Sequence, residues 1–213
     1  MTAQPASTTL DVVDWRRRVW GLYDEVRRVS VHDPRAGHQL WRAGRDDLFG
    51  SHPASPLPSA TRESFTGLPV AEYDPGWRWE LPVVDAPPAT MELSAGGDGD
   101  VPFERIGKVE LPGGETLDVW RLQSYGGGVF LPVRDGAAGR TGGSYGGGRY
   151  LLDTVKGADL GRGQGAASLV LDFNFCYNPS CAYNPAWACP LAPPGNVVRV
   201  EMGVGELYAP PPA

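Results

Sequence analysis

The sequence predicts a mainly β (α+β) fold, an antiparallel β-barrel or sandwich that carries an N-terminal helical pair. From residue 77 onward, short apolar stretches alternate with turn residues, which is typical of antiparallel strands. The chain contains 29 glycines and 21 prolines, and a composition so rich in turn formers suits many tight connections. The first 50 residues instead repeat apolar side chains at helical spacing.

Length and composition predict one domain. A chain of 213 residues with 41% hydrophobic residues can bury one sizeable core, and this apolar content argues against disorder. We predict disorder at 1–8 and a single domain over 9–210. Within it, 9–50 forms a helical segment and 77–210 a β-rich core ending in a loop rich in Cys, Asn and Pro.

The charge and hydropathy of the chain argue against binding to nucleic acid or insertion into a membrane. A formal net charge of −6 and a pI near 5.1 give no electrostatic reason to expect binding to nucleic acid or to an anionic membrane surface. No apolar run is long enough to span a bilayer. The N-terminus lacks a basic region followed by an apolar one, so we predict a cytoplasmic location.

Two helices are predicted before residue 50. From Thr9 to Val29 the apolar positions recur at steps of three and four, which forms one stripe of an amphipathic helix. Asp33-Pro34 then reads as a cap followed by a first-turn proline, opening a shorter helix that continues through Leu48. The stripe of the first helix consists of Val12, Trp15, Val19, Leu22 or Tyr23, Val26 and Val29.

Seven strands are predicted after a proline-rich ordered loop at 49–69. Pro112-Gly113-Gly114 is a good hairpin turn between two of them, and Asp135-Gly136 is another. The predicted strands are Trp77–Val84, Thr90–Leu93, Phe103–Leu111, Thr116–Leu122, Gly128–Val133, Gly148–Thr154 and Leu169–Phe173.

The segment 172–196 is dense in polar residues and cysteine. It repeats one tripeptide, as Tyr177-Asn178-Pro179 and as Tyr183-Asn184-Pro185. Asparagine before proline is held away from the helical region and can close a turn with its own side chain, so the repeat predicts a rigid irregular loop. Rigid loops on a β scaffold often carry functional sites, although the same polar groups would also satisfy the backbone of a buried loop.

The three cysteines leave several roles open. Cys176, Cys181 and Cys189 are spaced too widely for a zinc site, and all three histidines lie far upstream, so we predict no metal site. A thiol nucleophile would need a cation or base nearby to lower its pKa. The alternatives are small buried hydrophobic roles or a redox-labile pair of Cys181 and Cys189. The histidines are His32, His38 and His52.

The glycine-rich stretch 142–150 is not predicted to bind phosphate. It lacks the lysine and hydroxyl residue of a phosphate loop and precedes a strand rather than a helix, so it is interpreted as a tight connection. Arg149 at its end could present a bidentate fork to a carboxylate or phosphate, or form an ion pair. Asp153, Asp172 and Glu206 lie in or beside strand-like segments, where each could orient a ligand or act as a base.

A series of motifs resembles the bacterial and archaeal family catalogued as domain of unknown function number 1684. This resemblance implies a one-domain, mainly β, cytoplasmic protein, and it carries no established reaction. The family pattern has a small residue where Cys176 stands, which implies that Cys176 is the least functional of the three cysteines. The motifs are Arg45-Asp46-Asp47-Leu48-Phe49, Ser55-Pro56-Leu57, Phe65-Thr66-Gly67-Leu68, Tyr145-Gly146-Gly147-Gly148-Arg149-Tyr150-Leu151, Asp172-Phe173-Asn174, Tyr177-Asn178-Pro179-Ser180-Cys181-Ala182-Tyr183, Cys189-Pro190-Leu191 and Gly205-Glu206.

The leading hypothesis is a small-molecule enzyme of unknown substrate. Arg149 would hold an anionic substrate, and Cys181 would attack it in a hydrolysis or acyl transfer, with Asn174 or Asn178 donating to the oxyanion. The candidate catalytic residues are Cys181, Asp172 and Asn174, and the candidate substrate-binding residues are Arg149, Tyr150, Tyr177, Asn178, Tyr183 and Glu206.

Two alternatives stay open beside the enzyme. One is a non-catalytic β-barrel that binds a ligand or a cofactor such as flavin or haem, and the other is a structural or interaction protein. The partner expected is a small-molecule ligand. The cofactor stays unknown, and the oligomeric state stays open, with a homodimer among the alternatives.

Overall fold

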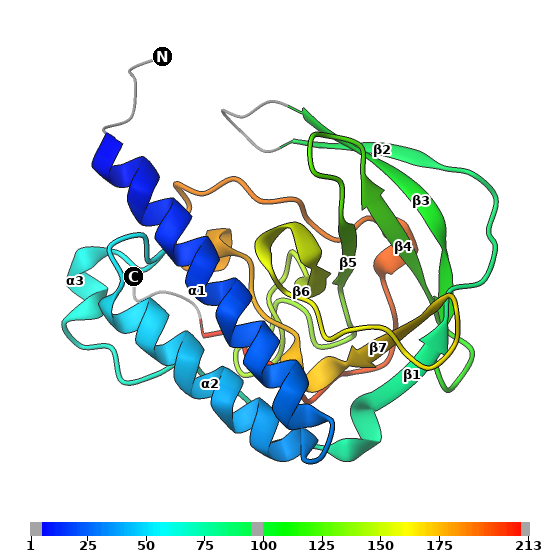
Figure 1. Ribbon diagram of the computed structural model, residues 1–213, viewed down its shortest axis with the longest axis horizontal. Helices are drawn as coiled ribbons and strands as arrows, with labels where there is room; N and C mark the ends of the chain where they lie inside the picture. Colours follow the sequence, from blue (N-terminus) through cyan, green and yellow to red (C-terminus); the bar gives the residue numbers. More distant parts are fainter. Residues whose placement is uncertain (1–5, 95–99, 210–213) are drawn as a thin grey trace.

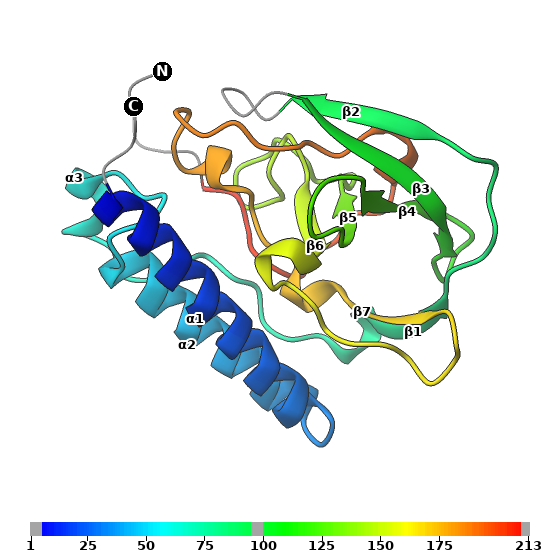
Figure 2. The ribbon, with the colours of Figure 1, turned by 45° about the horizontal axis from the view of Figure 1, so that its top comes forward.

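The N-terminal helical pair forms as predicted. The structure is a computed structural model that describes residues 6–94 and 100–209. Helices α1 (Ala6–Ser30) and α2 (Pro34–Ser51) lie side by side along one flank of the sheets (Figures 1 and 2). The Asp33 side chain accepts a hydrogen bond from the Ala36 amide at 3.0 Å and caps α2.

Two N-terminal boundaries differ from the prediction. Helix α1 begins at Ala6 rather than Thr9, so residues 6–8 of the stretch predicted to be disordered are helical, and residues 1–5 lie outside the described residues. The proline-rich loop at 49–69 contains the end of α2 and one short helix, α3 (Ser59–Arg62).

The larger sheet is a five-stranded antiparallel meander in the order β2-β3-β4-β5-β6. Gly113 and Gly114 adopt positive φ in the turn between β3 and β4, where the Leu111 amide bonds to the Glu115 carbonyl, which confirms the first predicted hairpin. The strands are β2 (Thr90–Ser94), β3 (Asp100–Glu110), β4 (Thr116–Leu122), β5 (Val129–Val133) and β6 (Arg149–Asp153).

The second hairpin prediction is wrong. Strand β5 ends at Val133 and β6 begins at Arg149, so Asp135-Gly136 opens a long connection rather than a two-residue turn. The Asp135 carboxylate accepts hydrogen bonds from the Ala137 amide at 2.7 Å and the Ser144 hydroxyl at 2.9 Å. These bonds join the start of the connection to the glycine-rich stretch that leads into β6.

The second sheet joins two strands that are distant in the sequence. Strand β1 (Arg78–Pro82) pairs antiparallel with β7 (Ser168–Asp172). Neither sheet closes into a barrel within the described residues, so the architecture is a sandwich-like α+β fold (Figure 1). The predicted mainly β fold is confirmed in its sandwich form.

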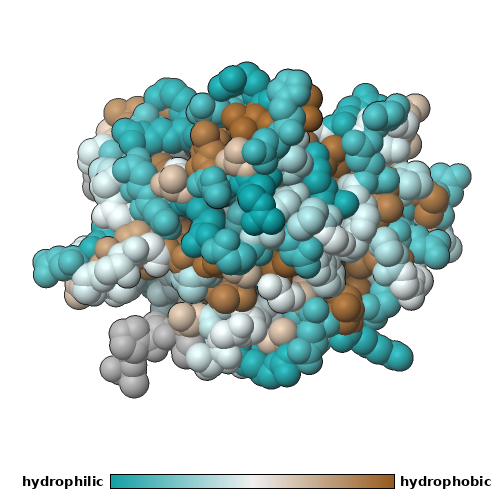
Figure 3. Space-filling view, turned by 90° about the horizontal axis from the view of Figure 1, so that it is seen from below, coloured by the Kyte–Doolittle hydropathy of each residue, from teal (hydrophilic) through white to brown (hydrophobic). Residues whose placement is uncertain are grey.

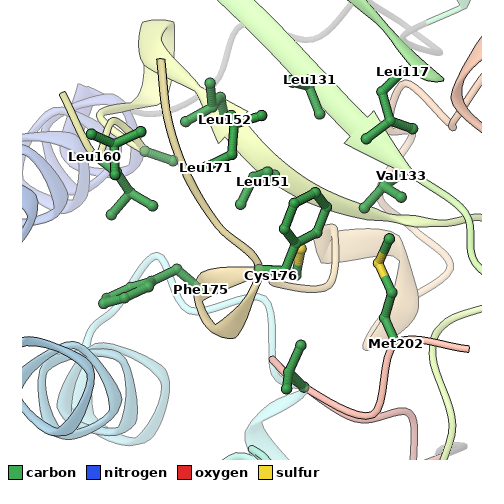
Figure 4. Close-up of a cluster of buried hydrophobic side chains, with 14 of the residues drawn as sticks. Leu117, Leu131, Val133, Leu151, Leu152, Leu160, Leu171, Phe175, Cys176 and Met202 are labelled. Carbon is green, nitrogen blue, oxygen red and sulfur yellow. The ribbon is translucent and has the colours of Figure 1, made fainter. Parts of the chain in front are cut away.

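The hydrophobic core lies between the sheets and the C-terminal segment. Leu131 and Leu151 from the five-stranded sheet gather with Leu171 of β7 and with Phe175 and Cys176 (Figure 4), and all five are fully buried. Burial raises the pKa of the Cys176 thiol to about 12. Cys176 therefore acts as a small hydrophobic side chain here.

The surface mixes polar and apolar side chains. On the face shown in Figure 3, hydrophobic residues occur in small groups separated by hydrophilic ones, which is ordinary for a globular surface. None of the helices in the described parts of the chain combines the length and the hydropathy needed to cross a membrane.

Candidate functional site

One hollow, here called the outer pocket, lies between α1, the five-stranded sheet and the C-terminal loop. Its volume is about 390 Å³, within the range of small-molecule sites. Most of its lining is apolar. It includes Trp15 from α1, Phe103 from β3, Phe130 from β5, and Trp187, Cys189 and Pro190 from the loop.

A smaller inner pocket of about 90 Å³ adjoins it. The two pockets share the side chains that line their boundary, which are Trp15, Lys156, Ser180 and Cys189. Tyr150, Tyr177 and Asn178, three of the predicted substrate-binding residues, line the inner pocket. Helix α2 closes it with Arg45, Leu48 and Phe49.

Arg45 is the arginine of the inner pocket. Its guanidinium lies 5.2 Å from the ring centroid of Trp41, 4.9 Å from that of Phe49 and 5.0 Å from that of Tyr177, which are favourable cation–π distances. It also donates from Nη2 to Oε2 of the fully buried Glu206 at 2.6 Å. Burial raises the pKa of the Glu206 carboxyl, and the charge of Arg45 opposes that rise.

Lys156 brings a second cation to the boundary of the pockets. It belongs to η3 (Thr154–Lys156), the short helix after β6, and its ammonium pairs with Asp153 at 3.1 Å. Asp153 and Arg16 also line the outer pocket. The charged groups of the hollow therefore lie on α1, α2, and the β6–η3 connection.

Cys189 is the cysteine whose surroundings favour the thiolate form. Its sulfur accepts a hydrogen bond from the Cys181 thiol, and that bond is the main cause that lowers the pKa of Cys189 to about 6. The backbone amides of Cys181 and Ser180 and the charge of Lys156 lower it further, against the effect of partial burial. A thiolate at neutral pH is the nucleophilic form of cysteine.

Cys181 is the hydrogen-bonding neighbour of Cys189. It lies in η5 (Ser180–Ala182), and the Tyr145 hydroxyl hydrogen-bonds to its sulfur at 3.7 Å. Donation to Cys189 raises the pKa of the Cys181 thiol, as does partial burial. The sequence predicted Cys181 as the nucleophile, whereas the hydrogen bonds and Lys156 favour negative charge on Cys189.

Arg149 does not line either pocket. It is fully buried and pairs with Asp135 at 2.6 Å. It also donates to the backbone carbonyls of Val204 at 2.5 Å, Glu206 at 3.1 Å and Met202 at 3.3 Å. Of the two roles that the sequence left open, the structure gives Arg149 the ion pair, because Asp135 and the C-terminal segment occupy the guanidinium that was predicted to bind substrate.

Asp172 and Asn174, two of the predicted catalytic residues, form a separate buried cluster. The Asp172 carboxylate accepts from Arg78 and from the Tyr73 hydroxyl, each at 3.2 Å, and burial raises its pKa. Asn174 donates from Nδ2 to the Asp74 carbonyl at 2.8 Å. The two residues fasten the segment before β1 to the end of β7, away from the residues that line the pockets.

The remaining predicted residues surround the inner pocket. The Tyr150 hydroxyl donates to the Pro190 carbonyl and so ties the C-terminal loop to β6. The Asn178 amide donates to Glu206 Oε2 at 3.1 Å. The Tyr183 ring packs edge-on against Phe49 at 5.0 Å. The first Tyr-Asn-Pro unit, 177–179, therefore lines the inner pocket, whereas the second contacts it only through the packing of Tyr183 on Phe49.

Sequence reasoning missed Arg45, Lys156 and Trp15. Arg45 had a readable signal, because Trp41, Arg45 and Phe49 follow one another at steps of four on the second helix, so an arginine stands on an aromatic stripe. Lys156 and Trp15 had no such signal. Across residues 6–94 and 100–209, no group of three or more His, Cys, Asp or Glu side chains is arranged to hold a metal ion.

Comparisons with known proteins place the chain in a family. A solution NMR structure of the uncharacterized protein from gene locus rrnAC0354 of Haloarcula marismortui is 30% identical, with a TM-score of 0.57, covering 84% of this chain and 96% of that chain. No curated protein matches the chain. The family model described as "Protein of unknown function (DUF1684)" matches residues 63–207, and the chain therefore belongs to the DUF1684 family.

Proposed function

We propose that the chain is a thiol enzyme that transfers or hydrolyses an acyl group of a small molecule, with Cys189 as the nucleophile. The observation that carries the proposal is the position of Cys189 at the boundary of the two pockets, within hydrogen-bonding reach of Cys181 and near Lys156. A stabilised thiolate beside an apolar hollow matches the requirements of covalent catalysis.

The chemistry needs few further groups. The Cys189 sulfur attacks the acyl carbon, a C–S bond forms, and the bond to the leaving group breaks as that group takes a proton from solvent. Water or an acceptor then attacks the thioester and restores the thiolate. Lys156 is the cation placed to stabilise the negative charge that develops on the carbonyl oxygen.

The pocket lining suggests the class of substrate. Trp15, Phe103 and Phe130 offer an apolar surface to the body of the molecule. Arg16, which lines the same pocket, is the cation that we assign to an anionic group of the substrate, in place of Arg149.

The test is a series of p-nitrophenyl esters and acyl thioesters of increasing chain length, assayed on wild type, Cys189→Ser and Cys181→Ser. We expect an acyl adduct on Cys189 by mass spectrometry, and loss of turnover in Cys189→Ser by roughly 100-fold or more. Cys181→Ser should form the adduct more slowly, because the main group that lowers the pKa of Cys189 is changed while Lys156 and the backbone amides remain. Equal turnover in wild type and Cys189→Ser would refute the proposal.

The second candidate is non-catalytic binding of an apolar ligand, which the mostly apolar lining of the outer pocket favours. Native mass spectrometry separates the two functions. A bound mass that survives in Cys189→Ser and is lost on denaturation indicates a ligand-binding protein, whereas a mass that persists after denaturation on Cys189 indicates an acyl-enzyme.

A further inference from the structure

We propose that Cys189 and Cys181 also form a redox pair that reduces hydroperoxides, with Cys189 attacking the peroxide and Cys181 resolving the product as a disulfide. This activity is separate from acyl transfer, although both use the Cys189 sulfur. It rests on the arrangement of the two thiols, on the pocket that one of them lines and on their place in the loop.

The two thiols are hydrogen-bonding neighbours, and both are partly exposed. Both cysteines are free and partly exposed, in contrast with the fully buried Cys176. The Cys181 thiol donates its hydrogen bond to Cys189, so the sulfur that would resolve an oxidised Cys189 is already its neighbour. Both lie in the irregular loop after β7 rather than in a strand, so closing a disulfide does not require a sheet to move.

The surroundings of Cys189 and Cys181 suggest a different role for each thiol. Cys189 lines both pockets and receives the backbone amides of Ser180 and Cys181 as well as the charge of Lys156. Cys181 lines neither pocket, and its sulfur faces the Tyr145 hydroxyl. An incoming molecule therefore meets Cys189 first, and Cys181 stands behind it.

The chemistry balances with a hydroperoxide as the oxidant. The Cys189 thiolate attacks the outer oxygen, the O–O bond breaks, and the alkoxide leaves as an alcohol after it gains a proton, which gives a sulfenic acid on Cys189. The Cys181 sulfur then attacks the Cys189 sulfur and displaces the hydroxyl as water. One disulfide, one alcohol and one water result, and an external dithiol restores both thiols by exchange.

The outer pocket indicates which hydroperoxides react best. Its lining is dominated by side chains such as Trp15, Phe103 and Trp187, which would bury the organic part of an alkyl or aryl hydroperoxide. Hydrogen peroxide gains nothing from this surface. We therefore assign the site to organic hydroperoxides rather than to hydrogen peroxide.

The experiment treats fully reduced protein with one equivalent of cumene hydroperoxide or hydrogen peroxide under anaerobic conditions. We expect loss of two thiols per alcohol formed and a disulfide between Cys181 and Cys189 by peptide mapping. The rate should exceed that of the unfolded chain by roughly tenfold or more, and cumene hydroperoxide should react faster than hydrogen peroxide.

Three variants sharpen the result. Cys181→Ser should stop at a sulfenic acid on Cys189, trapped by dimedone. Ester turnover assayed on the same wild-type protein separates the redox activity from the acyl-transfer proposal, because either activity can be absent while the other is present. Cys189→Ser should not react. Cys176→Ala, the matched control, should react like wild type. Equal oxidation of all three cysteines, or an oxidation rate no faster than that of the unfolded chain, would overturn the inference. If a variant fails to fold, peptide mapping and the oxidation rate of the wild type alone test the proposal.

Discussion

At the residue scale, two arginines show what a local pattern can and cannot tell. Arg149 stands beside a glycine turn, which is where a ligand-binding arginine is often placed, yet Asp135 and three carbonyls enclose it. Arg45 lies in the middle of a helix and lines the inner pocket. The local sequence shows which interactions a side chain can make, but it does not show which distant residues will become its partners in the fold.

The buried pair of Arg149 and Asp135 predicts a large loss of stability on substitution. Arg149→Leu leaves the Asp135 carboxylate buried without its partner, so urea unfolding should show a loss of about 3–5 kcal/mol. Arg140→Leu is the matched control, because Arg140 and its partner Glu201 are 57% and 63% exposed, and ion pairs so exposed contribute little to stability. Similar losses in both variants would contradict this account.

His38 predicts a pH dependence of stability. Its ring packs against Trp41, Tyr73 and Phe175 at 5.4–5.6 Å, and burial lowers its pKa from 6.5 to about 4, with a smaller contribution from Arg42. Between these two pH values the unfolded chain binds a proton that the folded chain does not. The free energy of unfolding should therefore fall as pH decreases through this window, by up to about 1.4 kcal/mol per pH unit.

The measurement is the difference in unfolding free energy between wild type and His38→Gln from pH 7 to 4. The comparison cancels contributions common to both proteins, including the buried carboxyls of Asp172 and Glu206, whose raised pKa values act in the opposite direction. His32→Gln, at an exposed position, is the control. A constant difference across the range would disprove the role of His38.

At the element scale, the strands could be predicted because their signals are local. The predicted strand Thr116–Leu122 coincides with β4, and Leu169–Phe173 is offset by one residue from β7. Apolar runs and turn residues mark such segments directly. The pairing of β1 with β7 could not be predicted, because the two strands are about ninety positions apart in the sequence. The sequence of a strand does not indicate which distant strand it pairs with.

The contact between α1 and η3 depends on Gly157. This residue has φ +94°, and a Cβ added there would lie 3.1 Å from the Trp20 backbone nitrogen. Gly157→Ala should combine backbone strain of about 1–2 kcal/mol with a steric cost of roughly 1–3 kcal/mol, and should loosen the wall of the pocket that carries Lys156.

Gly114→Ala is the matched control for that contact. Gly114 has a similar φ of +85° with open space around it, so chemical denaturation of this variant reports backbone strain alone. We expect Gly157→Ala to be the less stable of the two and Cys189 to be alkylated at a changed rate in it. Equal stability of the two variants would mean that α1 adapts freely to the added methyl group.

At the scale of the whole molecule, the sequence predicted the fold better than the site. The helical pair and the antiparallel sheets follow from periodicity and turn chemistry. The hollow forms where α1, α2, β3, β5, β6 and the C-terminal loop meet, so its lining is a product of packing. Tyr177 and Asn178 were identified because the loop motif itself lines the inner pocket, and Tyr150 because it follows the glycine-rich stretch into β6. Trp15 and Lys156 line the pockets only as a result of the tertiary structure.

The C-terminal segment 202–206 affects when the protein can fold during its synthesis. Arg45 and Arg149 are made well before Glu206 and the carbonyls that satisfy them. Until that segment arrives, Arg45 lacks its buried carboxylate partner, and Arg149 has Asp135 but lacks the carbonyls that accept its other hydrogen bonds. Because burying unpaired polar groups is costly, we expect docking of the helical pair to wait until translation passes residue 206. We therefore expect this protein to fold late and as a unit, and an interrupted chain to be a substrate for chaperones and proteases.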